Sequence, residues 1–123
     1  MMELKDYQAR VLADLAGYLD VLDATPNLAQ AYTDYWAGKG VRVGGEAGMD
    51  SYKNTVPGVP HICAKVPTAG GKTFIAVNAL ETVFTALARR SPARPRLVVW
   101  LAPSLTIVDQ TVKALNSPEH PYR

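Results

Sequence analysis

Residues 61–74 read HICAKVPTAGGKTF. They separate a polar, glycine-rich stretch, residues 38–60, from a following stretch in which apolar residues recur at regular spacing. The mostly apolar run 61–66 predicts a strand that is buried on both faces, with Cys63 as a small core residue. A loop of small residues follows, and apolar side chains at helical spacing then predict a helix from Gly71 or Lys72 to about Arg90. Such a bend favours an anion, because backbone N–H groups and the helix dipole both face it.

The loop also supplies the side chains that a nucleoside triphosphate requires. Lys72 is expected to contact the β- and γ-phosphates as the catalytic lysine, and the Thr73 hydroxyl is expected to bind Mg²⁺. ATP and Mg²⁺ are therefore the expected cofactors. The expected nucleotide-binding residues of this segment are Thr68, Ala69, Gly70, Gly71, Lys72 and Thr73. The strict pattern has glycine where Val66 stands, so the alternative is a glycine turn with a chance Lys-Thr pair.

Periodicity predicts the remaining elements. Residues 4–23 and about 26–37 have apolar stripes at helical spacing, with Thr25 as a plausible cap, and 38–60 reads as a long loop with room for a short hairpin. LVVWLA (97–102) predicts a second buried strand that includes Trp100, and a last helix runs to about residue 116. Strand, helix, strand, helix predicts an α/β fold, with a parallel sheet and flanking helices preceded by N-terminal helices.

Three segments resemble superfamily 2 helicases. PTAGGKT is similar to their motif I, LVVWLAPSLTIVDQT (97–111) to motif Ia, and LKDYQARVL to the segment that reads adenine. The resemblance implies a partial RecA-like domain of the P-loop NTPase class. It also implies that Gln8 binds adenine and that Pro103 and Ser104 contact a nucleic-acid strand. Ala69 stands where the family usually has glycine, and we expect Gly70 to take the positive φ.

The sequences of these motifs are most similar to those of the restriction (Res) subunit of type III restriction–modification enzymes. This resemblance implies an ATP-dependent DNA translocase or helicase that acts on double-stranded DNA, with a modification (methyltransferase) subunit as a further partner. Residues 1–37 would be the adenine-reading segment, 38–60 a loop or insertion, and 61–123 the motif I to motif Ia core. The alternatives are another superfamily 2 DNA or RNA helicase, a non-catalytic nucleotide-binding module, or a P-loop kinase.

Composition and missing motifs limit the function further. The net charge of +2 excludes binding to nucleic acid through a general positive field. One cysteine, no long apolar run and a charged N-terminus predict a cytoplasmic protein without membrane contact. The sequence has no Asp-Glu pair, so we do not expect these 123 residues to hydrolyse ATP alone. In the resembling family the two strands are not neighbours, so we expect the isolated chain to be marginally stable, to self-associate, or to be a fragment of a longer product.

Overall fold

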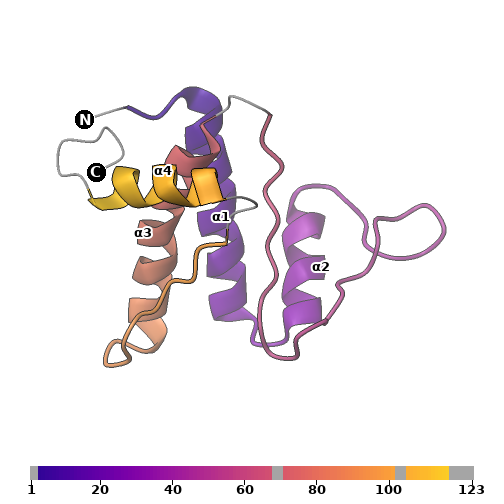
Figure 1. The fold of residues 1–123 in the computed structure, drawn as a ribbon. Coiled ribbons are helices and arrows are strands. Elements are labelled where there is room, and N and C mark those ends of the chain that lie inside the picture. The colour runs from indigo at the N-terminus through magenta and orange to yellow at the C-terminus, as the bar shows by residue number, and fades with distance from the viewer. Residues whose placement is uncertain (1–2, 68–70, 102–104, 117–123) are drawn as a thin grey trace.

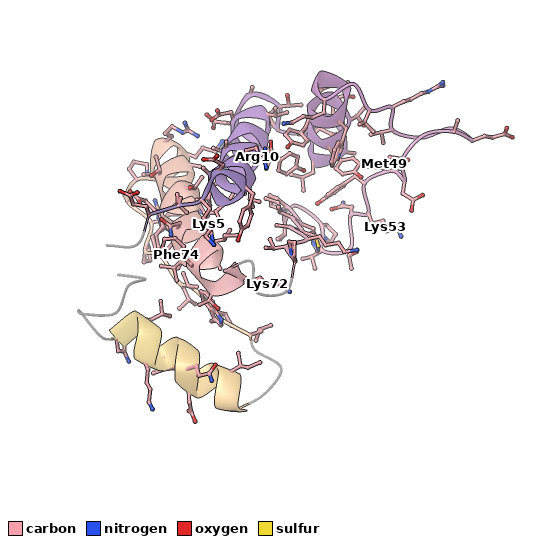
Figure 2. The ribbon with its side chains drawn as sticks, turned by 90° about the horizontal axis from the view of Figure 1, so that it is seen from above. Lys5, Arg10, Met49, Lys53, Lys72 and Phe74 are labelled. Atoms are coloured by element: carbon pink, nitrogen blue, oxygen red, sulfur yellow. The ribbon has the colours of Figure 1, made fainter. Side chains whose placement is uncertain are left out.

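The structure, a computed structural model, describes residues 3–67, 71–101 and 105–116. They form four helices, which are α1 (Asp6–Ala24), α2 (Leu28–Gly38), α3 (Lys72–Arg90) and α4 (Leu105–Asn116). The central helix is α1, with α3 packed along one side and α2 along the other (Figure 1). The view from above shows α4 lying apart from these three helices (Figure 2).

The helices lie close to the positions that apolar spacing predicts. The first spans 6–24 where 4–23 was expected, and α3 begins at Lys72 and ends at Arg90 as expected. The cap of α2 differs, because Asn27 rather than Thr25 precedes the helix. The Asn27 side-chain oxygen accepts the N–H of Gln30 at 3.0 Å. Asparagine is among the best N-caps, so α2 starts after Asn27 rather than after Thr25.

The buried apolar cluster lies between α1 and α2. Tyr18 and Leu22 on α1 pack with Ala31 on α2, and partly buried residues surround them. The Tyr18 ring meets the ring of Tyr35 edge to face, with 5.2 Å between their centroids. This geometry is one of the favoured arrangements of aromatic pairs, so the cluster fixes α2 against α1.

Two different kinds of contact fix α3 against α1. At the start of α3, Phe74 and Ile75 are buried. At its end, two arginines form ion pairs with α1. The pairs are Arg89–Asp20 at 3.1 Å and Arg90–Asp23 at 2.7 Å. Their side chains remain about half exposed, so each pair contributes at most about 1 kcal/mol.

The parallel sheet predicted from the sequence is not present in the described residues. The expected strand 61–66 is irregular, and so is the expected strand 97–102 over its described residues, 97–101. The β-structure that the described ranges contain is a single bridge between Val43 and Met49. Cys63 is exposed rather than buried. The prediction of an α/β, partial RecA-like P-loop NTPase fold is therefore wrong for this structure, which is helical. A buried strand requires partners for its N–H and C=O groups, and neither segment lies beside another strand.

The long segment between α2 and α3 is irregular, as expected. Its one regular feature is the Val43–Met49 bridge, in which the N–H of Gly44 donates to the Met49 carbonyl at 2.8 Å. Gly48 lies against the backbone of Gly44 with no room for a side chain. The segment then runs as an open trace between α1 and α2 toward the start of α3 (Figure 1). None of the described helices has both the length and the apolar character that crossing a bilayer requires.

Candidate nucleotide-binding site

The start of α3 has the backbone geometry of an anion site. Gly71 is the N-cap residue, with φ +74° and ψ 42°, in the left-handed region. Glycine takes this conformation without the strain that a side chain would add. Since glycine also has no side chain, it cannot cap the helix in the way that Asn27 caps α2. The positive end of the α3 dipole therefore lies beside Gly71.

Gln8 approaches this same point from the first turn of α1. Its side chain is 5% exposed, and its Oε1 accepts the backbone N–H of Lys5 at 2.9 Å. Its Nε2 lies on Gly71, only 2.5 Å from the place that a Cβ on this glycine would occupy. Two residues that were predicted separately to contact a nucleotide therefore meet, although 63 positions separate them in the sequence (71 minus 8).

The two side chains expected to handle phosphate and metal lie at this helix start. Lys72 is the first residue of α3 and is exposed, whereas Thr73 is partly buried. Figure 2 shows Lys5, Lys72 and Phe74 at the end where α1 and α3 begin, whereas Met49 and Lys53 lie beside α2. The positive charges at this end therefore belong to the first residue of α3 and to the residue before α1, whose first turn adds the negative charge of Asp6.

Five of the predicted site residues lie outside the described residues. They are Thr68, Ala69 and Gly70 of the loop, and Pro103 and Ser104 before α4. The expectation that Gly70 takes a positive φ is thus not addressed, but a positive φ is present at the neighbouring Gly71. Of the predicted nucleotide-binding set, the described site consists of Gln8, Gly71, Lys72 and Thr73.

The described donors can bind phosphate but supply little for a metal ion. Among the residues that the structure covers, no three His, Cys, Asp or Glu side chains gather into a metal site. Thr73 offers one hydroxyl oxygen. Mg²⁺ prefers six oxygen ligands and keeps several of its waters, so at this place the remaining ligands would be phosphate oxygens and water. A metal ion at this place would therefore need most of its ligands from a nucleotide and from water.

A separate groove lies farther along the same helix pair. It has a volume of about 350 Å³ and runs between α1 and the later turns of α3. Its lining residues are Ala16, Leu19, Asp20, Glu81, Thr82, Thr85, Ala86 and Arg89. Glu81 follows Lys72 by nine residues, which is roughly 14 Å along a helix. The groove is therefore distinct from the helix start that carries the predicted motif.

Comparison with known proteins identifies no relative: no family model matches the chain, and neither a curated protein nor a solved structure matches it. The resemblance to superfamily 2 helicases therefore rests on the quoted motifs alone.

Two features of the site were not predicted from the sequence. The first is that Gly71 has a positive φ; its position directly before the helix is the signal that indicates an N-cap. The second is the structural role of Gln8, which is the third residue of α1 and hydrogen-bonds back to Lys5. Glutamine at this helical position commonly bonds back to the N-cap N–H. Gln8 therefore has a helix-capping role beside its expected role in binding adenine.

Proposed function

We propose that this chain binds ATP at the start of α3. One observation supports the proposal: the carboxamide of Gln8 lies against Gly71, so the expected adenine-reading residue lies beside one of the expected phosphate-binding residues. The site's chemistry requires small backbone groups, a helix start and a cation, and Gly71, α3 and Lys72 provide them. The buried strand that was expected to precede the loop, residues 61–66, is irregular in the structure and gives the proposal no support.

Each described residue has a distinct role in this proposal. The first N–H groups of α3 and the Lys72 ammonium bind the phosphates, and Thr73 binds a Mg²⁺ ion that the phosphates carry with them. Gln8 contacts the adenine edge. Its side chain is 5% exposed and its oxygen accepts the N–H of Lys5, so Gln8 would have to turn toward the nucleotide to contact the base.

The wider role that we propose follows the sequence motifs. The chain would be the ATP-binding portion of a cytoplasmic, ATP-dependent DNA translocase or helicase that resembles a type III restriction subunit. Double-stranded DNA and a modification subunit would be its partners. These assignments rest on the motif sequences at residues 66–74 and 97–111.

Equilibrium dialysis with ATP and Mg²⁺ tests the site. Charge-assisted hydrogen bonds contribute about 1.5–3 kcal/mol each, so Lys72→Ala should weaken ATP binding by roughly 10- to 100-fold. Lys53→Ala removes the same charge beside α2 and should leave the affinity unchanged. An absence of ATP binding by the wild-type chain, or equal affinities for the Lys72→Ala and Lys53→Ala variants, would rule the proposal out.

A further inference from the structure

Residues 50–59, which we call the strap, form a small loop of their own after α2. The Val43–Met49 bridge closes the chain directly before the strap. Within the strap, the Tyr52 hydroxyl donates to the carbonyl oxygen of Val59 at 3.1 Å, so the loop is held together by its own hydrogen bond. Figure 2 shows Lys53 of the strap beside α2.

Little of the strap is buried against the helices. Every one of its residues except Tyr52 is exposed. Two interactions fasten it to α2, and both involve Tyr32. The Tyr32 hydroxyl donates to the carbonyl oxygen of Asp50 at 3.1 Å in an exposed position, and the rings of Tyr32 and Tyr52 have centroids 5.6 Å apart. A segment with few buried contacts and exposed hydrogen bonds opens locally at a low free-energy cost.

A buried hydroxyl without a partner lies near the strap. Tyr18 on α1 is 7% exposed, and its hydroxyl oxygen has no hydrogen-bond partner in the described structure. Burial raises the pKa of Tyr18, and the phenols of Tyr52 and Tyr32 raise it further, which places both phenols close to the Tyr18 hydroxyl. Burying a hydroxyl without a partner is costly, and water reaches such a group only when its cover moves.

We propose that the strap is a lid that opens away from Tyr18 while the helices stay folded, and that hydration of the Tyr18 hydroxyl favours the open form. Near the far end of the strap, Gly58 has φ +78° with open space where a Cβ would lie, which provides a backbone position that can rotate. The inference does not depend on nucleotide binding, since the start of α3 takes no part in it.

Two tyrosine hydroxyls have opposite effects on this lid. The Tyr32 hydroxyl has its protein partner in the closed form, so its removal favours opening. The Tyr18 hydroxyl gains a partner, water, only in the open form, so its removal favours closing. Tyr32→Phe and Tyr18→Phe therefore form a matched pair, because each variant loses one hydroxyl and keeps its ring.

Trypsin cleavage after Lys53 measures the opening in the full chain, because a protease cuts a bond only when the segment around it is unfolded. Initial rates are followed by mass spectrometry. Tyr32→Phe should raise the rate after Lys53 about fivefold, and Tyr18→Phe should lower it about fivefold, as expected for one hydrogen bond. Cleavage after Lys65, which lies in the exposed irregular segment beyond the strap, should be the same in all three forms. Rates after Lys53 that change in the same direction or not at all, or equal changes after Lys65, would overturn the proposal.

Urea distinguishes local opening from unfolding of the whole chain. Cleavage by the glutamate-specific protease Glu-C after Glu81, in the middle of α3, requires the helices to unfold. The dependence on urea scales with the surface that is exposed. Below the unfolding transition, cleavage after Lys53 should therefore increase only slightly with urea, whereas cleavage after Glu81 should increase steeply. Equal urea dependence at the two sites would show that the strap opens only with the whole chain, and the lid would be refuted.

Discussion

Replacing Gly71 with alanine should destabilise the structure through two separate effects of the added Cβ atom. The first is backbone strain, since Gly71 has φ +74° and a left-handed conformation costs a residue with a Cβ about 1–2 kcal/mol. The second is a collision, because the new Cβ would lie 2.5 Å from Gln8 Nε2. If Gln8 moves away, its hydrogen bond to Lys5 is lost at a cost of about 1 kcal/mol. The total loss is then about 2–3 kcal/mol.

Urea denaturation followed by far-UV circular dichroism measures this loss. Gly17→Ala is the matched control, because Gly17 lies inside α1 and an added Cβ there meets no atom within 4 Å. It should raise the free energy of unfolding by about 0.5–1 kcal/mol. In a Gln8→Ala background, the cost of Gly71→Ala should fall to the strain alone. If Gly71→Ala is as stable as the wild-type chain, or if its cost is the same with and without Gln8, the geometry described for the α1–α3 junction is refuted.

Three further predictions concern the α1–α2 core and the helix ends. Tyr18→Phe should raise the free energy of unfolding by about 1 kcal/mol, because the buried Tyr18 hydroxyl has no hydrogen-bond partner in the described structure. Burial, with smaller contributions from Tyr52 and Tyr32, raises the pKa of Tyr18. Above the ordinary tyrosine pKa of about 10, the unfolded chain loses this proton before the folded chain does. The free energy of unfolding of the wild-type chain should therefore fall as the pH rises above about 10, and Tyr18→Phe should reduce that fall. Asn27→Ala should cost about 1 kcal/mol in urea denaturation, since it removes the α2 cap; a cost near zero would show that the cap is not formed in solution. Arg90→Ala should cost at most about 1 kcal/mol, and this cost should shrink in high salt; a salt-independent cost would contradict an exposed ion pair.

The sequence predicts the helices well because helix formation is largely local. The stripe on residues 4–23 and the pattern from Lys72 to Arg90 each require only side chains three and four residues apart, and both helices are present. A strand, in contrast, requires hydrogen-bonding partners elsewhere in the chain. The apolar run 97–101 has the composition of a buried strand, yet Leu97 and Leu101 are almost fully exposed. Composition alone did not reveal that the partners are absent from the described residues.

The candidate site was predicted in part. The motif residues Gly71, Lys72 and Thr73 were placed correctly at a helix start, because a glycine followed by an apolar stripe is a local signal. The contact of Gln8 with Gly71 depends on how α1 packs against α3, which no local pattern contains. The resemblance alone suggested that these residues belong together. The hydrogen bond from Lys5 to Gln8, by comparison, follows from the position of glutamine in the first turn.

The most direct test of the central claim is a titration of the ¹⁵N-labelled chain with ATP and Mg²⁺, followed by NMR. The claim predicts that the largest shift changes occur at the backbone amides of residues 71–75 and at the side-chain amide of Gln8, while the amides of α2 stay in place. Changes concentrated on α2 or in the groove near Glu81, or no saturable change, would contradict a nucleotide site at the start of α3.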